Sequence, residues 1–265
     1  MSELESLFEP LGDGRFRASE IARGPWDPNA LHGGSVTGLL GELVERFEPH
    51  AEFVVTRAAF DLYGSAPVGE LIVALRETRP GKRIQMLEAT VEAGGRTVCR
   101  SSFVRQRSED VGPGREELPE LDSFTPPPLL DEAGPPIAMP DSPPMLGGAA
   151  IEIRFAEGGF DRPGPAAAWF RWLVPPLGQP ASTLSLALAA ADFANGISAA
   201  VRFDQYLFVN TDLTVHLHRY PEGEWVLLDA RTLLEPDGRG LASARLFDQQ
   251  GPIGLAAQAL FVDRR

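Results

Sequence analysis

The sequence predicts an α+β protein built from two similar units in tandem, each an antiparallel sheet wrapped around one central helix. Three observations lead to this fold class. One order of elements occurs twice, hairpin turns join consecutive strand-like runs, and a proline-rich stretch separates the two copies. With 265 residues, of which 43% are hydrophobic, the chain is long enough to bury a core in each unit.

The first unit, residues 1–107, contains one predicted helix followed by predicted strands. A short alternating segment at 15–20 precedes the segment SVTGLLGELVERF. Apolar residues recur in this segment at three- and four-residue spacing, which is typical of a helix with a wide apolar stripe. Four strand-like runs follow the helix, at 53–63, 70–79, 84–92 and 97–107. Glycine-containing turns join the last three of them as hairpins.

The second unit, residues 148–265, repeats this order. A largely apolar helix is predicted at 182–194, with predicted strands at 150–155, 168–174, 207–218, 224–234, 241–247 and 253–262. The segments APVGELIVALRET and RYPEGEWVLLDART align without gaps, which places Thr78 over Thr232. Similar elements at matched spacing indicate duplication of one unit. Between the copies, residues 108–147 are rich in proline, which cannot donate a backbone hydrogen bond, so we expect a linker there.

The order of elements defines the fold of each unit. Hairpin turns connect antiparallel neighbours, so a helix followed by such a meander is not a parallel βαβ fold. The helix is apolar over much of its circumference, and we therefore expect a curved sheet to wrap around it. Two such units in one chain make a double hotdog fold.

Composition excludes several classes of function. Lys and Arg total 24 against 37 Asp and Glu, and a net charge of -13 argues against a nucleic-acid-binding surface. Cys99 is the only cysteine, so neither an intramolecular disulfide nor a cysteine-rich metal site is expected, and His216 and His218 lack a third metal ligand of suitable spacing. No apolar run approaches the roughly 20 residues of a membrane span, and the acidic start does not resemble a secretory signal. We expect a cytoplasmic protein without membrane insertion.

Three segments carry a resemblance to a known family: LHGGSVTGLL at 31–40, LALAAADFANGIS at 186–198 and NTDLTVHLHR at 210–219. With them the sequence resembles the acyl-CoA thioesterase II family, in which two hotdog units are fused in one chain. The resemblance covers nearly the whole length apart from the predicted linker. It implies hydrolysis of an acyl-CoA to a free acid and coenzyme A. No cofactor and no metal are expected, since coenzyme A is part of the substrate.

The resemblance also implies a catalytic trio of Asp212, Thr232 and Gln258. In that assignment the Asp212 carboxylate is the general base, while the hydroxyl and the amide hold the attacking water. Taken singly, each residue has an ordinary structural explanation, as a strand-end carboxylate, a β-branched strand residue and an outward polar residue. The assignment therefore depends on the three occurring together and in order.

Further site residues are predicted around the two helices. Gly33 and Gly34 open the first helix, where unpaired N–H groups can stabilise an oxyanion, although a glycine pair also suits a tight turn. His32 is expected to contact the substrate, to cap this helix or simply to be exposed. Asp192 is a polar residue inside an otherwise apolar helix, and we expect it to form a hydrogen bond near the site or to support the site from behind.

Coenzyme A requires a local basic patch in so acidic a chain. Arg79, Lys82 and Arg83 surround a hairpin turn and are predicted to contact its phosphates, with a solvated turn as the alternative. Two other functions remain open. One is a hotdog hydratase or dehydratase acting on enoyl or hydroxyacyl thioesters, which usually depends on a His paired with a carboxylate, and the other is a non-catalytic acyl-CoA-binding module. Paired hotdogs commonly associate further, so we expect a homo-oligomer.

Overall fold

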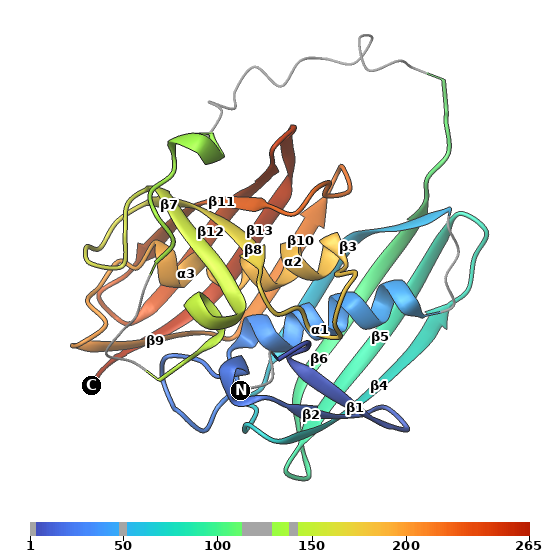
Figure 1. The fold of residues 1–265 in the computed structure, drawn as a ribbon, viewed down its shortest axis with the longest axis horizontal. Coiled ribbons are helices and arrows are strands. Elements are labelled where there is room, and N and C mark those ends of the chain that lie inside the picture. Colours follow the sequence, from blue (N-terminus) through green and yellow to red (C-terminus); the bar gives the residue numbers. More distant parts are fainter. Residues whose placement is uncertain (1–3, 48–51, 113–128, 138–142) are drawn as a thin grey trace.

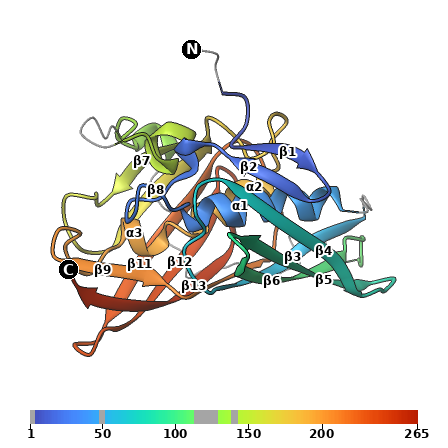
Figure 2. The ribbon, with the colours of Figure 1, turned by 90° about the horizontal axis from the view of Figure 1, so that it is seen from below.

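The computed structural model describes residues 4–47, 52–112, 129–137 and 143–265 (Figure 1). Its described strands form one 13-stranded sheet in the order β1-β2-β4-β5-β6-β3-β10-β13-β12-β11-β8-β7, with β9 pairing on β13. The sheet curves, and Figure 2 shows the central helices enclosed by it. Within these described ranges, no helix has both the length and the apolar character that crossing a membrane requires.

The first half has one central helix and a sheet of six strands. Its elements are β1 (Phe8–Gly12), β2 (Arg15–Ala18), α1 (Gly33–Arg46), β3 (Phe53–Leu62), β4 (Glu70–Arg79), β5 (Ile84–Ala93) and β6 (Arg96–Arg107). The predicted helix and strands are present. Strand β1 was not predicted, because its five residues include Pro10, which a strand tolerates only at special positions such as a sheet edge.

The second half repeats this arrangement with two interruptions. Its elements are β7 (Ile151–Glu157), β8 (Ala166–Trp172), α2 (Thr183–Ala191), α3 (Ala194–Ile197), β9 (Tyr206–Asn210), β10 (Asp212–Leu217), β11 (Val226–Leu234), β12 (Arg239–Asp248) and β13 (Gly251–Arg264). The single predicted helix at 182–194 is divided into α2 and α3, and the single predicted strand at 207–218 into β9 and β10. Both divisions lie at the candidate site.

The two halves are joined through their sheets. Strand β3 pairs antiparallel with β10, and Leu213 lies opposite Phe60. On either side of this pair the strand order is mirrored, with β6-β5-β4-β2 in one direction and β13-β12-β11-β8 in the other. This arrangement confirms the double hotdog predicted from the repeated order of elements.

The central helices α1 and α2 pack against each other closely and antiparallel. A Cβ atom added at Gly38 would lie 3.2 Å from the Cβ of Ala189, and one added at Gly41 would lie 2.9 Å from the Cα of Ser185. Only glycine allows this approach at Gly41. Because the helices run in opposite directions, the N-terminus of α1 lies beside the C-terminal end of α2.

Part of the predicted linker is described. Backbone N–H groups of Gly134 and Ile137 donate to Phe155 and Ile153, so this stretch lies along β7. Leu146 is fully buried near the start of α1. The rest of the predicted linker, at 113–128 and 138–142, lies outside the described residues, and the boundaries predicted for the two units remain a prediction.

Candidate active site

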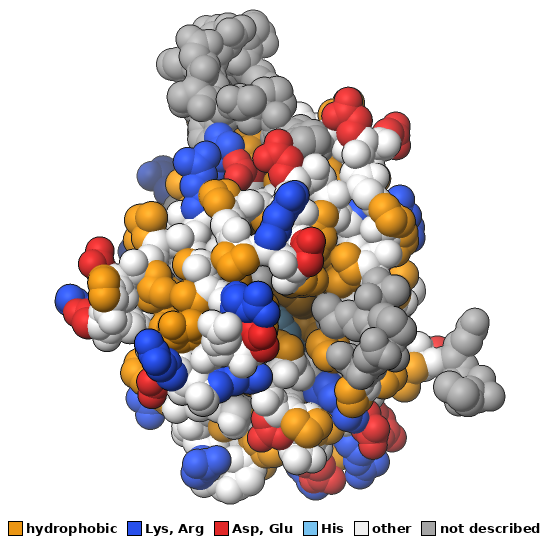
Figure 3. All heavy atoms as spheres, turned by 90° about the vertical axis from the view of Figure 1, so that its left-hand side faces the viewer, with side chains coloured by type: hydrophobic (Ala, Val, Ile, Leu, Met, Phe, Trp, Pro, Cys, Tyr) orange, Lys and Arg blue, Asp and Glu red, His pale blue; other side chains and the backbone are white. Residues whose placement is uncertain are grey.

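A cavity of about 500 Å³ lies where α1 begins and the two halves meet. Its walls come from the loop before α1, the end of β3, the start of β6, the α2–α3 junction and the end of β9. The polar groups in its wall include His32, Asp192, Asn195 and Asn210. Figure 3 shows a hollow on one side of the molecule with a histidine side chain within it and hydrophobic side chains close by.

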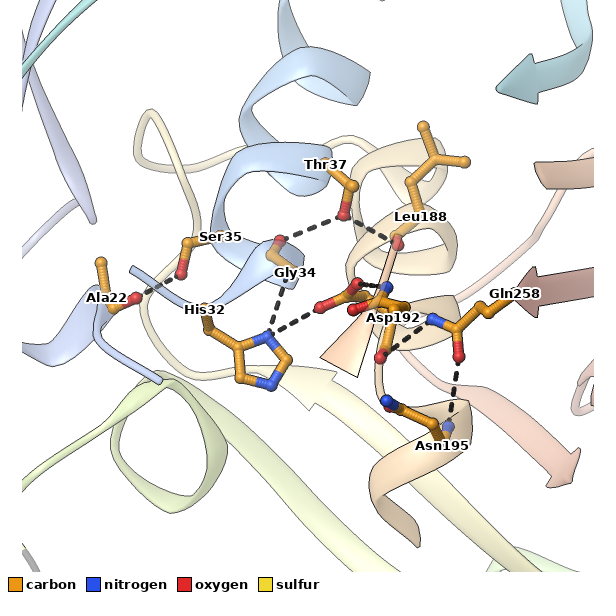
Figure 4. A network of polar contacts seen from close by, with 10 residues as sticks. Ala22, His32, Gly34, Ser35, Thr37, Leu188, Asp192, Asn195 and Gln258 are labelled. Carbon is orange, nitrogen blue, oxygen red and sulfur yellow. Dashed lines mark hydrogen bonds and ion pairs between the residues drawn. The ribbon is translucent and has the colours of Figure 1, made fainter. Parts of the chain in front are cut away.

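Asp192 is the most tightly held carboxylate of this cavity. It is only 4% exposed and caps the C-terminus of α2. Its Oδ1 accepts a hydrogen bond from the Nδ2 of Asn210 at 2.7 Å. Figure 4 shows its other contact, in which Oδ2 lies 3.0 Å from the Nδ1 of His32. A Cβ atom at Gly33 would lie 2.7 Å from both carboxylate oxygens, so the carboxylate fits there only because residue 33 is glycine.

His32 links the carboxylate to the start of α1. It is the N-cap residue of this helix, and the backbone N–H of Gly34 donates to its Nδ1 at 2.9 Å. The imidazole also stacks on Phe193, with ring centroids 4.3 Å apart. A ring nitrogen has one in-plane position, which holds either a lone pair or a proton. The Nδ1 of His32 can therefore either accept the hydrogen bond from Gly34 or donate one to Asp192, but not both. When it donates to Asp192, the backbone N–H of Gly34 loses this acceptor.

The N-terminus of α1 supplies the group that can bind a negatively charged oxygen. Gly33 is the first residue of the helix and lines the cavity. An N–H at this position has no intrahelical acceptor, and the helix dipole adds a partial positive charge. A carbonyl oxygen in the cavity can approach Gly33 closely, with the Asp192 carboxylate next to it.

Gln258 lies behind Asp192. It is fully buried; its Nε2 donates to the backbone carbonyl of Asp192 at 3.2 Å, and its Oε1 accepts from the backbone N–H of Asn195 at 3.2 Å. The amide thus bridges the break between α2 and α3 and fixes the backbone that carries Asp192. In this arrangement both ends of the amide are bound to backbone, and Gln258 is not part of the cavity wall.

Thr232 and Asp212 do not join this group. The Thr232 hydroxyl lies 2.8 Å from the hydroxyl of Ser198, and it is not part of the cavity wall. Asp212 accepts a hydrogen bond from the backbone N–H of Ala259 at 2.7 Å. The structure therefore divides the predicted trio, since only Gln258 of the three contacts Asp192.

A β-bulge explains the position of Asp212. Asn210 lies opposite Leu260 and Thr214 lies opposite Ala257, so four steps along one strand match three along the other. The extra residue switches the inward face from even-numbered residues in β9 to odd-numbered residues in β10. Asn210 consequently points to Asp192, while Leu213 takes the inward position instead of Asp212.

Asn210 and Asn195 were not among the predicted site residues. Asn210 belongs to the quoted segment NTDLTVHLHR, but only the bulge, which the sequence does not reveal, places its amide on the inner face. Asn195 follows Asp192 by three residues, the spacing of one helical turn, and this is the signal that could have identified it.

The predicted CoA contacts lie at the other end of the sheet. Arg79, Lys82 and Arg83 are exposed around the β4–β5 hairpin. Cys99, in the cavity wall, is seven residues along β6 from Gln106, which pairs with Ile84 at this hairpin. At about 3.3 Å per residue this separation is roughly 23 Å. Arg100 and Arg265 lie nearer to the cavity, since each contacts an aromatic ring of its wall.

Comparisons with known proteins agree with this fold. The family model of the acyl-CoA thioesterase N-terminal domain matches residues 22–106, and that of the acyl-CoA thioesterase C-terminal domain matches residues 123–262. A search of curated protein sequences finds no match.

Several solved structures resemble this chain over nearly its whole length. A protein described as a thioesterase II from Thermobifida fusca YX is 17% identical, with a TM-score of 0.72 over 98% of this chain and 96% of that one. The tesB protein of Mycobacterium avium subs. paratuberculosis is 15% identical, with a TM-score of 0.63 over 97% and 96%. The acyl-CoA thioesterase II TesB2 of Mycobacterium marinum is 16% identical, with a TM-score of 0.61 over 97% of this chain and 95% of that one.

At these identities the solved structures establish the fold, and the two family models together span both halves of the chain. The protein belongs to the acyl-CoA thioesterase family of thioester hydrolases.

Proposed function

We propose that the protein hydrolyses acyl-CoA thioesters by direct attack of water, with Asp192 as the general base. The observation that carries this proposal is the placement of a buried carboxylate, which Asn210 holds by a hydrogen bond and His32 contacts, directly beside the N-terminus of α1 in the cavity wall. This base takes the place of Asp212, which the bulge turns away from the cavity.

Each step follows from the groups present. Water attacks the thioester carbonyl carbon while the Asp192 carboxylate accepts a proton from the water. The carbonyl oxygen becomes an oxyanion, which accepts a hydrogen bond from the backbone N–H of Gly33. The tetrahedral intermediate collapses with cleavage of the carbon–sulfur bond. The departing CoA sulfur takes up the proton, so that one water and one thioester yield one acid and one CoA.

Two arginines at the cavity mouth are suited to the phosphates of CoA. The Arg100 guanidinium lies 5.7 Å from the ring centroid of Tyr63, and that of Arg265 lies 5.1 Å from the ring of Trp26. Both rings belong to the cavity wall. We expect Arg100→Ala to raise KM about tenfold, the equivalent of one lost charge-assisted bond, with kcat unchanged. Arg83→Ala, at the distant hairpin, is the matched control and should leave KM unchanged.

A hydratase is the second candidate function, since the His32–Asp192 contact is the type of pairing that hotdog hydratases use. The family assignment favours hydrolysis. Loss of absorbance from an enoyl-CoA without release of CoA would favour the hydratase instead.

The decisive experiment compares two isosteric substitutions in a CoA-release assay with a thiol-reactive dye. Asp192→Asn should lower kcat by roughly 10²–10⁴-fold, the usual contribution of a general base. Asp212→Asn should leave kcat near the wild-type value, since Asp212 is bonded to the backbone of Ala259. Circular dichroism and urea unfolding establish that both variants are folded. The reverse outcome, an inactive Asp212→Asn and an active Asp192→Asn, would refute the assignment of the base.

A further inference from the structure

The cavity has an open end and a closed end. At the open end Tyr63 and Phe261 are 56% and 52% exposed, whereas Val36, Val98 and Cys99 in the same wall are at most 4% exposed. Asp192 is also buried, so the carboxylate lies toward the closed end. A thioester carbonyl positioned at Gly33 therefore has its CoA moiety toward the mouth and its acyl group toward Val36 and Cys99.

On the sheet, the cavity wall ends after one row of residues. Leu62 of β3 pairs with Cys99 of β6, and both line the cavity. The next inward-facing row is Phe60 with Ser101, and neither belongs to the wall. Phe60 is 1% exposed and its ring meets that of Phe103 edge to face, with centroids 5.6 Å apart. An aromatic pair thus fills the space directly behind the row that lines the cavity.

On the helix, the wall ends at the same depth. Gly33 and Val36 line the cavity, while Leu39 and Leu40, one turn further along α1, are fully buried and do not. Val36 lies three residues beyond Gly33, which is about 4.5 Å of helix at 1.5 Å per residue. Carbon–carbon bonds of about 1.5 Å at near-tetrahedral angles advance an extended chain by roughly 1.25 Å per carbon. The depth available beyond the carbonyl is therefore about four carbons.

We propose that Phe60, supported by Phe103, closes the acyl end of the cavity and restricts the enzyme to short acyl-CoA substrates of about four to six carbons. This inference rests on the proposed function, because it assumes a thioester bound at Gly33. Phe60 is a specificity-determining residue in this scheme, since it sets how far an acyl chain can enter and takes no part in the chemistry.

The experiment measures kcat/KM on straight-chain acyl-CoAs of two to twelve carbons for the wild type and for Phe60→Ala. The wild type should prefer about four to six carbons and act at least about tenfold more slowly on ten, in line with the discrimination that excess methylenes produce in a closed pocket. Phe60→Ala should move the preferred length upward and raise kcat/KM for ten carbons about tenfold. If Phe60→Ala does not fold, Phe60→Leu should show the same shift with a smaller amplitude.

Phe247→Ala is the matched control, because Phe247 is equally buried but belongs to a separate cluster with Trp169 and Trp225. Its chain-length profile should match that of the wild type. A wild-type preference for ten or more carbons would overturn this inference while leaving the proposed function intact, and so would identical profiles for the Phe60 variants and the wild type. No CoA release at any chain length would overturn the proposed function and this inference with it.

Discussion

Gly33→Ala tests the placement of the Asp192 carboxylate without removing a polar group. The new Cβ would lie 2.7 Å from both carboxylate oxygens and 3.0 Å from their carbon. Non-bonded contacts of this kind are comfortable only near about 3.5 Å, so the carboxylate or the helix must shift by roughly half an ångström or more. The hydrogen bond from Asn210 and the contact with His32 both end on these oxygens and are disturbed together.

The expected effect is kinetic more than thermodynamic. A misplacement of about 1 Å costs on the order of 100-fold in rate, so kcat should fall by roughly this factor while KM changes little. Overpacking costs about 1–3 kcal/mol. Alanine regains up to ~1 kcal/mol of helix propensity. The free energy of unfolding, measured with urea, should therefore fall by no more than about 3 kcal/mol.

Gly64→Ala is the control for this prediction. Gly64 lines the same cavity, but a Cβ there has no atom within 4 Å. Its kcat should match that of the wild type in the CoA-release assay. A Gly33→Ala enzyme with wild-type kcat would refute the reasoning, since the carboxylate would then tolerate displacement or take no part in the reaction.

Three further predictions concern stability and reactivity. Burial opposes ionisation of Asp248, but hydrogen bonds from Arg219 hold the pKa of its carboxyl below the ordinary value. The ionised carboxylate therefore stabilises the folded protein above about pH 4, and this stabilisation is lost as pH falls through the folded-state pKa. Asp248→Asn removes the carboxylate partner of Arg219, which among the described residues keeps only the carbonyl of Gly251, and should cost about 3–5 kcal/mol at pH 7. Urea unfolding at several pH values should then show a flatter acid limb, and an unchanged limb would contradict this. Burial, with Asp61 and Asp192 nearby, raises the pKa of Cys99 to about 12, so a thiol-reactive dye should label the protein only after denaturation, and rapid labelling of the native fold would be inconsistent with this burial. Gly41→Ala should cost about 1–3 kcal/mol by pressing on the Cα of Ser185, whereas Gly196→Ala, which meets nothing within 4 Å, should cost less; equal losses would argue against close helix packing.

The architecture could be predicted because each element carries its own periodicity. Strand β4 occupies the predicted residues 70–79, and α1 (Gly33–Arg46) overlaps the apolar stripe of 35–47. Glycine-containing turns identified the hairpins between them. The duplicated order then left the double hotdog as the arrangement that buries both helices.

The site was less accessible to prediction because it depends on two local irregularities. The run LALAAADFANGIS contains no residue that stops a helix at Ala191, and the break there coincides with the bridge that Gln258 makes between the backbones of Asp192 and Asn195. The bulge after Asn210 likewise depends on pairing with β13. A regular continuation of β9 would have kept Asp212 on the inner face of the sheet, so the role predicted for Asp212 depended on a regularity that the chain does not have.

A duplicated fold has two helix N-termini, and this chain fills one of them with its own side chains. Glu42 lies nine residues after the start of α1, just as Asp192 lies nine residues after the start of α2. Glu42 faces the N-terminus of α2. The Glu42 carboxylate accepts a hydrogen bond from the backbone N–H of Ser182 at 2.9 Å and forms an ion pair with Arg46 at 2.6 Å. Both carboxylate oxygens of Glu42 are therefore used in contacts that stabilise the fold, and we expect one active site per chain. Glu42→Gln should reduce stability yet leave kcat unchanged, in contrast to Asp192→Asn.

Glu45 provides a pH-dependent test of the same end of the molecule. It accepts hydrogen bonds from the hydroxyls of Ser182 and Tyr220, and burial raises the pKa of its carboxyl in spite of the Ser182 bond. A raised folded-state pKa means that the folded protein binds a proton more tightly, so stability falls as pH rises from the unfolded value of about 4.3 through the folded value. Glu45→Gln, which can still bond both hydroxyls, removes this loss and should be more stable than the wild type at pH 7. Parallel curves of unfolding free energy against pH for the two proteins would show that this carboxylate is not buried at the helix end.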